Sequence, residues 1–383
     1  MDSKHTKMDS IDIKTAYEAL DPVQECFGAR STDTTYSTDT KYSLEILSLE
    51  RLYAASKAMG ITALLAYALR KRGIRDSQFR TALAIAQRRA LLLDAEYKKI
   101  SNALCAHGIR HLPMKGIVIK SIYPSVGLRE MSDIDIWFDP SHAEDVKNIM
   151  SGLGYNAKYF GVSKHDVYLK PPMFCVEMHR IVIDTDVLPE SAAYYNEQWE
   201  KLNCACKEDE FVLTQSREDF YVYVIAHAYK HDLIAGVGVR ALLDIYVMLL
   251  KWEDLNMSYI LQECRKLGIA DFELLVRRLA LHLFDRDALD QEDKDRLDQF
   301  VLSGVNGNMN RYYSNALDHS DSKRSYILSR LRTTDEQVKD HPFLLRHKAL
   351  RPLYFPLRLA KAILKRPKLL STELKILAKY EKK

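Results

Sequence analysis

The sequence predicts an α+β protein in which a small mixed sheet lies between two helical regions. Three observations predict this class. Residues 43–108 carry apolar side chains at the three- and four-residue spacing of helices, residues 109–185 contain short segments with the alternating pattern of strands, and residues 186–340 are mostly helical in pattern. The chain has 383 residues, 47% hydrophobic and 28% charged, which is enough to bury a large core in two or three domains.

The N-terminal region divides into two parts. Residues 1–42 are rich in Asp, Ser, Thr and Lys, and residues 31–40 lack apolar periodicity, so we predict a mobile leader there. From residue 43 to residue 108 the helical spacing predicts three or four helices that precede the sheet. We expect these helices to form one wall beside it.

Asp133 and Asp135 lie at the start of an otherwise apolar segment that ends at Phe138. Side chains alternate across a strand, so Asp133 and Asp135 are predicted to share one face. Two carboxylates on one rigid edge can hold a hard divalent cation such as Mg²⁺, the ion that phosphoryl and nucleotidyl transfer use. The simpler alternative is an Asx-rich turn before a strand, because Asp-x-Asp occurs by chance in many proteins.

The segments on either side of this pair supply further candidate groups. Residues 174–183 are predicted to form another strand, with Glu177 and His179 on one face, so Glu177 can provide a third carboxylate. Upstream, Lys115 and Gly116 precede a short helix that ends before Pro124. Free N–H groups at the start of a helix bind phosphate, and a lysine adds charge. The alternative for Lys115 is a solvated residue at a helix start.

Two elements connect the Asp133 strand to the Glu177 strand. Residues 140–152 are predicted to form a capped helix with Ser141 near its start and Gly152 at its end. Residues 155–168 are predicted to form hairpin-like strands. Close to the acidic pair, Arg129 can clamp a phosphate or form a surface ion pair, and Ser132 can orient the turn into Asp133 or act structurally.

These motifs together resemble the uncharacterised nucleotidyltransferases of the DNA polymerase β-like superfamily. The resemblance covers roughly positions 60 to 250 and is carried by Leu112–Gly116, Tyr123, Gly127–Arg129, Ser132–Asp135, Gly152–Tyr155, Val176–His179, His227–His231 and Arg240–Asp244. It implies a small nucleotidyltransferase sheet flanked by N-terminal and C-terminal helical regions. The chain departs from the superfamily at one point, because Lys115-Gly116 stands where a Gly-Ser pair usually opens the phosphate-binding helix.

The resemblance also implies that the helix after the sheet faces the nucleotide. We expect this helix to begin near Ser216, where Ser216 and Asp219 have capping-box-like spacing. His227, Lys230 and His231 are then implied to contact the nucleotide, with Arg240 and Asp244 one helix later. A zinc hydrolase is disfavoured, since Ala228 stands where the His-Glu-x-x-His motif needs glutamate.

An ion pair between Arg240 and Asp244, four residues apart on one helix, is the structural alternative to a nucleotide-binding role for these two residues. Under either interpretation, we expect residues 186–340 to form the second wall of the active-site cleft.

The last segment, residues 341–383, is strongly basic. It holds twelve lysines and arginines against two glutamates, a net charge of +10, whereas the whole chain is +4 and the first 340 residues therefore sum to −6. Leucines and isoleucines alternate with the basic residues, a composition typical of amphipathic elements that bind anionic lipid or nucleic acid. Prolines at 352, 356 and 367 are expected to break it into short helices. The alternative is packing on the acidic remainder of the protein.

The six cysteines show no paired metal-site spacing, and the sequence has neither a signal peptide nor an apolar run of about 18 residues. We therefore expect reduced thiols in a cytoplasmic protein, peripheral at the inner face of a membrane if the basic segment binds lipid.

The predicted activity is transfer of a nucleoside monophosphate from a nucleoside triphosphate to a hydroxyl, with Mg²⁺, or alternatively Mn²⁺, held by Asp133, Asp135 and Glu177. The acceptor is left open among a small molecule, a peptide, a protein and a tRNA. Three other functions remain alternatives: a nucleotide-binding protein without turnover, a kinase-like phosphotransferase, and a helical scaffold bound to a membrane or nucleic acid.

Overall fold

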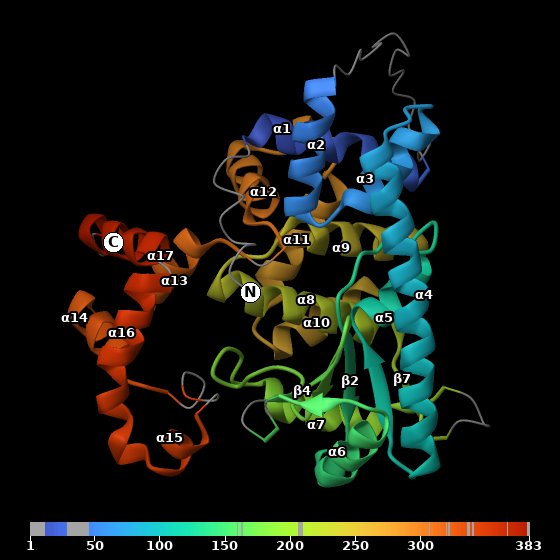
Figure 1. Cartoon of the computed structure of the whole chain (residues 1–383). Coiled ribbons are helices and arrows are strands. Elements are labelled where there is room, and N and C mark those ends of the chain that lie inside the picture. Colours follow the sequence, from blue (N-terminus) through green and yellow to red (C-terminus); the bar gives the residue numbers. More distant parts are fainter. Residues whose placement is uncertain are drawn as a thin grey trace.

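The computed structural model describes residues 12–28, 46–158, 160–161, 164–205, 210–305, 307–318, 322–334, 341–365 and 367–380, with the single residues 320 and 338. Figure 1 shows a helical body, a sheet on one side of it and an arm of C-terminal helices beside it. The prediction of an α+β fold with helices before and after a small mixed sheet is confirmed.

The N-terminal segment is folded where it is described. Helix α1 (Ile13–Leu20) and the 3₁₀ helix η2 (Asp21–Cys26) follow residue Asp12, whose carboxylate accepts the Thr15 N–H as an N-cap. Ala16, Ala19, Leu20 and Val23 are completely buried. The prediction of a mobile leader is therefore wrong for residues 12–28, because a short apolar helix face was hidden by the polar composition of the whole segment. The rest of that prediction, residues 1–11 and 29–42, lies outside the described residues.

The helices predicted before the sheet are confirmed as α2 (Ile46–Met59), α3 (Thr62–Lys71) and α4 (Ser77–Ala106). Helix α4 begins at Asp76, whose carboxylate accepts two backbone N–H groups. Its 30 residues run from the helical body along the sheet, so one helix joins both parts of the molecule (Figure 1).

The sheet has five strands in the order β1-β2-β5-β4-β3. Strand β2 pairs in parallel with β5, and the other pairs are antiparallel. The pairing places Asp135 beside Glu177 and His165 beside His179. The strand bounds are β1 His111–Met114, β2 Ile134–Phe138, β3 Asn156–Ala157, β4 His165–Lys170 and β5 Phe174–His179.

The two faces of the sheet differ in chemistry. Ile134, Ile136 and Met178 point to the face covered by α4 and α6 (Ala143–Gly152), where they join a buried apolar cluster. Residues at the alternate positions, Asp135 and Glu177 among them, lie on the opposite face. The short helix α5 (Gly116–Ile119) and the 3₁₀ helix η3 (Lys120–Ile122) leave the end of β1 beside these carboxylates.

Gly127 fixes the loop that leads into β2. Its φ is +83°, and a Cβ atom there would lie 2.6 Å from the backbone of Gln87 in α4. Only glycine combines this backbone conformation with so close an approach. The loop is therefore held against α4, which fixes the position of Arg129 two residues later.

The region after the sheet is mostly helical, as predicted. Ser216 caps α8, since its hydroxyl oxygen accepts the Asp219 N–H at 3.0 Å, which confirms the predicted helix start. A two-stranded sheet, β6 (Asn203–Cys204) and β7 (Leu213–Thr214), precedes this helix. The helices are α7 Ser191–Lys201, α8 Arg217–Ile234, α9 Val239–Lys251, α10 Met257–Lys266, α11 Ala270–Leu281 and α12 Gln291–Ser303, with a 3₁₀ helix at Arg286–Ala288.

The remaining helices form the arm, defined here as helices α13 to α17. Helix α13 contacts α8 in the body and α17 in the arm. The Glu373 carboxylate accepts hydrogen bonds from Tyr326 and Arg330, which joins α17 to α14. The basic segment is divided into short helices, as predicted, but of the three prolines only Pro367 lies at a boundary, where it begins α17; Pro352 lies within η7 and Pro356 in the first turn of α16. The helices of the arm are α13 Met309–Asp318, α14 Lys323–Leu331, α15 Pro342–Arg346, η7 Lys348–Leu353, α16 Tyr354–Lys365 and α17 Pro367–Lys379.

Within the described residues, no helix is long and apolar enough to cross a membrane. The five described cysteines are all free thiols.

Candidate active site

Two carboxylates meet where β2 and β5 run side by side. Parallel pairing puts Asp135 directly opposite Glu177, and the side chain of Asp135 is only 5% exposed. Asp133 lies just before β2 and is half-buried. It is close enough to Asp135 and Glu177 for their charges to raise its pKa, in addition to the effect of burial. The structure thus brings together the three carboxylates that the sequence singled out.

Lys115 lies against these carboxylates from the end of β1. Its Nζ donates to Asp135 Oδ1 at 2.5 Å and lies 4.0 Å from Glu177 Oε2. Its φ is +50°, the one positive φ among the described residues other than glycine. Such a backbone is strained for any side chain and is normal for glycine. Lys115 therefore has the backbone conformation expected of the glycine in a Gly-Ser pair, and adds an ammonium group to it.

Two histidines complete the group on the sheet. His179 Nε2 lies 2.9 Å from Asp135 Oδ1 and 3.5 Å from Glu177 Oε2, and His165 Nε2 lies 3.7 Å from the same Glu177 oxygen. The prediction that Glu177 and His179 share a face is confirmed by these contacts. Among the described residues, the buried Nδ1 atoms of both histidines have no hydrogen-bond partner. His165, Glu177 and His179 can together offer ligand atoms to one metal ion.

The pKa values of the three carboxylates are shifted in different directions. Burial and the charges of Asp135 and Glu177 raise the pKa of Asp133. Burial alone would also raise the pKa of Asp135, but Lys115 and His179 outweigh it and hold that pKa below its usual range. The same balance, with His179 as the main stabilising partner, lowers the pKa of Glu177. Negative charge is therefore offset at Asp135 and in excess at Asp133.

One face of α8 lies opposite the sheet group. Tyr223, His227, Lys230 and His231 follow each other at helical spacing, and His227 Nε2 lies 3.2 Å from His231 Nε2. The buried Tyr223 hydroxyl has no hydrogen-bond partner among the described residues, and its pKa is raised by burial and by the charges of Asp135 and Glu177. The helix that the resemblance places against the nucleotide thus lies near the carboxylates, while its contact with a nucleotide stays a prediction.

This helix face and Lys164 form a group of basic side chains. Burial and the neighbouring Lys164 lower the pKa of Lys230 to about 7. Burial, together with Lys230 and Lys115, lowers the pKa of His231 to about 4. Burial and the charge of Lys115 also lower the pKa of His227. Burial is the largest cause of each shift, and neighbouring lysines add to it, so an anion bound there would favour the charged form of Lys230.

Arg129 and Asp244 lie beside this group but bind each other. Arg129 donates from Nε and Nη2 to the two carboxylate oxygens of Asp244, each at 2.7 Å, and the Tyr123 hydroxyl donates to Asp244 Oδ1 at 2.6 Å. The side chains of the pair are 11% and 9% exposed. The suggested pair of Asp244 with Arg240 on one helix is thus replaced by a pair with a residue 115 positions earlier, which the spacing of the sequence did not indicate.

The remaining predicted site residues have different surroundings. Arg240 Nη1 donates to the Glu130 carbonyl at 3.3 Å, and burial and the nearby Arg129 lower its pKa to about 10. Its charge also acts on Asp133. Gly116 begins α5, as predicted, and Ser132 is exposed on the turn before Asp133. The phosphate-binding roles of these residues stay predictions.

A family model described as uncharacterised nucleotidyltransferase matches residues 47–285, which include every residue of this site. The chain belongs to this family. Searches of curated proteins and of solved structures found no match. Membership in the uncharacterised nucleotidyltransferase family supports nucleotidyl transfer as the general activity and a nucleotide as a substrate.

Three residues of the candidate site were not predicted from the sequence: Lys164, His165 and Tyr223. Tyr223 precedes His227 by four residues on α8, so helical spacing could have indicated it. His165 reaches Glu177 only because β4 pairs with β5 in the observed register. No local pattern indicates Lys164.

The strained backbone at Lys115 leads to a first prediction. Lys115→Gly and Lys115→Ala both remove the ammonium group, but only glycine accepts a φ of +50° without strain. We expect the glycine variant to be more stable than the alanine variant by roughly 1–2 kcal/mol. Urea unfolding of the two variants measures this difference. Equal stability, or a more stable alanine variant, would contradict the assignment of strain to this residue.

Proposed function

We propose that this protein transfers a nucleoside monophosphate from a nucleoside triphosphate to an acceptor hydroxyl, using a divalent cation held by Asp133, Asp135 and Glu177. One observation carries the proposal: the register of β2 and β5 sets Asp135 beside Glu177, with the Lys115 ammonium against Asp135 and with Lys230 on the face of α8 that also carries His227 and His231. Carboxylates for a metal and cations for phosphate are the two parts that this chemistry needs.

Asp133, Asp135 and Glu177 offer the carboxylate oxygens that a divalent cation prefers, and Glu177 also belongs to the group of possible ligands that includes His165 and His179. Burial, and after it the charges of Asp135 and Glu177, raise the pKa of Asp133, and Lys115 and Arg240 only partly offset this. A cation between these carboxylates would relieve the repulsion and accept their oxygens as ligands. When bound, such an ion neutralises phosphate charge and orients the triphosphate.

The protein's own cations are suited to the phosphates. Lys115, at the end of β1, Lys164, just before β4, and Lys230, on α8, can neutralise the β- and γ-phosphates. Lys230 is only 8% exposed, so a phosphate contact there would be shielded from water and correspondingly strong. His227 and His231 can donate or accept a hydrogen bond in their neutral forms.

The proposed step is an in-line displacement at the α-phosphorus. A bond forms between the acceptor oxygen and this phosphorus, and the bond from phosphorus to the oxygen that bridges to the β-phosphate breaks. Glu177 accepts the proton of the acceptor hydroxyl. Lys115, Lys164 and Lys230 stabilise the charge that passes to the departing pyrophosphate.

Labelled nucleotides distinguish this reaction from its alternatives. The protein should transfer label from an α-labelled triphosphate to an acceptor and release unlabelled pyrophosphate. Transfer from a γ-labelled triphosphate, leaving a diphosphate, would identify a phosphotransferase instead. Tight nucleotide binding without either product would identify a binding protein, and no nucleotide binding at all would overturn the proposal.

The two histidines beside the carboxylates lead to a prediction about metal preference. Mn²⁺ accepts imidazole nitrogen as well as oxygen, whereas Mg²⁺ strongly prefers oxygen. His179→Gln is expected to weaken Mn²⁺ binding by about 10- to 100-fold and Mg²⁺ binding much less. Electron paramagnetic resonance titration measures free Mn²⁺ directly, and Mg²⁺ affinity follows from competition. His142→Gln, at an exposed histidine outside the site, is the matched control; equal losses for both ions would contradict the role of His179.

The lowered pKa of Lys230 leads to a prediction about pH. Below a pKa of about 7 Lys230 is charged in the free protein, and above it the charge is progressively lost. Phosphate groups are fully ionised above pH 7, and His231 is already neutral there because its pKa is about 4. Triphosphate affinity is therefore expected to fall by about tenfold between pH 7 and pH 9.

Calorimetric titration at several pH values measures this fall. Lys230→Arg keeps the charge and should bind with nearly constant affinity over the same range. Lys230→Met should bind weakly at every pH. A wild-type affinity that does not change between pH 7 and pH 9 would count against a phosphate contact at Lys230.

A further inference from the structure

The arm exposes most of the large apolar side chains found on the surface. Of the twenty exposed large apolar residues among those described, eleven lie between Ile327 and Leu374. Leu353 and Leu364 are 75% and 81% exposed, more than any of the others. Contiguous apolar surface of this kind marks an interaction site in a folded protein.

Four exposed apolar residues, one at the end of η7 and three on α16, form one stripe. Leu353, Leu357, Ala360 and Leu364 follow each other at intervals of four, three and four residues, so they lie along one side of the helix. Leu357 and Ala360 are exposed like the two leucines at the ends of the stripe. This face therefore has no partner among the described residues that would bury it.

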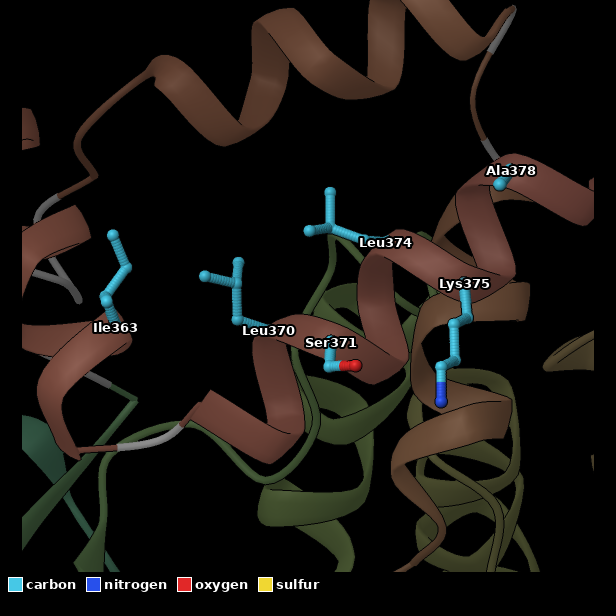
Figure 2. Close-up of a pocket in the computed structure, with 6 residues that line it drawn as sticks. All are labelled: Ile363, Leu370, Ser371, Leu374, Lys375 and Ala378. Atoms are coloured by element: carbon cyan, nitrogen blue, oxygen red, sulfur yellow. The ribbon is translucent and has the colours of Figure 1, made fainter.

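A hollow of about 420 Å³ continues this apolar surface between the end of α16 and α17. Figure 2 shows Leu370 and Leu374 directed toward the same side of α17, and the hollow is lined by Ile363, Leu370, Ser371, Leu374, Lys375 and Ala378. Helix α17 thus presents apolar side chains next to a lysine, a composition that suits a helix lying at an interface.

The basic side chains around this surface are not neutralised within the segment. Arg346, Lys348, Lys361, Lys375 and Lys379 are all exposed. Glu373 is the single acidic residue in the sequence from 341 to 380, and it is already bound by Arg330 and Tyr326. The apolar stripe is therefore surrounded by excess positive charge.

We propose that the arm binds the surface of an anionic lipid bilayer through α16 and α17. Leucines and isoleucines gain free energy by entering the acyl region, while lysines remain at the negatively charged headgroups. The helices have 12 and 13 residues, too short to span a bilayer that needs about 20, so they would lie along its surface.

The chemistry of the surface favours lipid over the two other possible partners. Basic side chains can bind the phosphates of nucleic acid, but nothing in nucleic acid would bury the aliphatic side chains of the stripe and the hollow, which also lack the aromatic side chains on which single-stranded bases stack. A second copy of the arm would bury the leucines but would also bring two lysine-rich segments together, which opposes association. An anionic bilayer satisfies both the apolar and the basic side chains.

Sedimentation of the full-length protein with vesicles tests this proposal. We expect binding to phosphatidylcholine vesicles that contain phosphatidylglycerol, little binding to phosphatidylcholine alone, and weaker binding at high salt. The double variants Leu353→Gln/Leu364→Gln and Lys361→Glu/Lys375→Glu should each bind at least about tenfold more weakly. Circular dichroism checks that the helices are retained.

Substitutions of exposed residues on α4 provide the controls. Leu91→Gln and Lys98→Glu should bind vesicles like the unmodified protein. Unchanged binding in both arm variants would overturn the proposal, as would equal binding to neutral and anionic vesicles. Two other results would overturn it too: concentration-dependent dimers that Leu353→Gln/Leu364→Gln abolishes without any vesicle binding, and a preference for RNA over vesicles. None of these outcomes depends on nucleotidyl transfer.

Discussion

Replacing Asp135 by asparagine is expected to lower nucleotidyl transfer by at least about a thousandfold. Asp135 is the most deeply buried of the three carboxylates, and Lys115 and His179 both donate to it. The substitution keeps the shape of the side chain but removes the charge that would hold the cation and position these two partners. Initial rates with a labelled triphosphate at saturating Mg²⁺ and at saturating Mn²⁺ measure the loss.

An aspartate-to-asparagine substitution at an exposed position distinguishes the loss of a metal ligand from a general loss of activity. Asp145→Asn, on α6 outside the site, should have the activity of the unmodified protein. Asp133→Asn should resemble Asp135→Asn in activity while disturbing fewer contacts of the folded protein. An Asp135→Asn protein that is folded and keeps a tenth or more of the activity would contradict the assignment of this carboxylate to the metal.

Breaking the pair between Arg129 and Asp244 is expected to lower the free energy of unfolding by about 3–5 kcal/mol. The pair joins the loop before β2 to α9, and both of its side chains are mostly buried. Asp244→Ala leaves the Arg129 guanidinium buried beside Arg240 without its carboxylate, so two cations would repel each other there. Chemical denaturation of the variant and the unmodified protein measures the loss.

An exposed pair of the same chemistry serves as the control. Asp254→Ala, which breaks the pair with Arg217 on the surface, should change the free energy of unfolding by about 1 kcal/mol or less. Arg129→Met combined with Asp244→Leu should recover much of the loss, because no buried charge is then left unpaired. If Asp244→Ala were as stable as the unmodified protein, Arg129 would be free to bind phosphate and its structural role would be refuted.

Alternation along strands was enough to predict much of the site. The period of two placed Glu177 and His179 on one face, and the distance from His179 to both carboxylates confirms it. Capping chemistry likewise predicted the start of α8 at Ser216. These features depend on residues close together in the sequence, where local geometry decides the outcome.

Features that depend on distant pairing were not predictable in the same way. The partner of Asp244 is Arg129, and nothing near Asp244 in the sequence indicates a residue so far away. His165 enters the site through the register between β4 and β5, which local pattern does not specify. Helix α1 was missed for another reason: the polar composition of residues 1–42 as a whole obscured a short stretch whose Ala16 and Leu20 are buried in the core.

The most direct test of the central claim is transfer of label from an α-labelled nucleoside triphosphate, measured with and without a divalent cation. Candidate acceptors should be screened with all four nucleotides, and pyrophosphate should be measured alongside. We predict that the unmodified protein transfers the label only with the cation, and that Asp133→Asn and Asp135→Asn do not transfer it. Release of a nucleoside diphosphate in place of pyrophosphate would contradict nucleotidyl transfer. Equal transfer of the label by the two variants would contradict the role of Asp133 and Asp135.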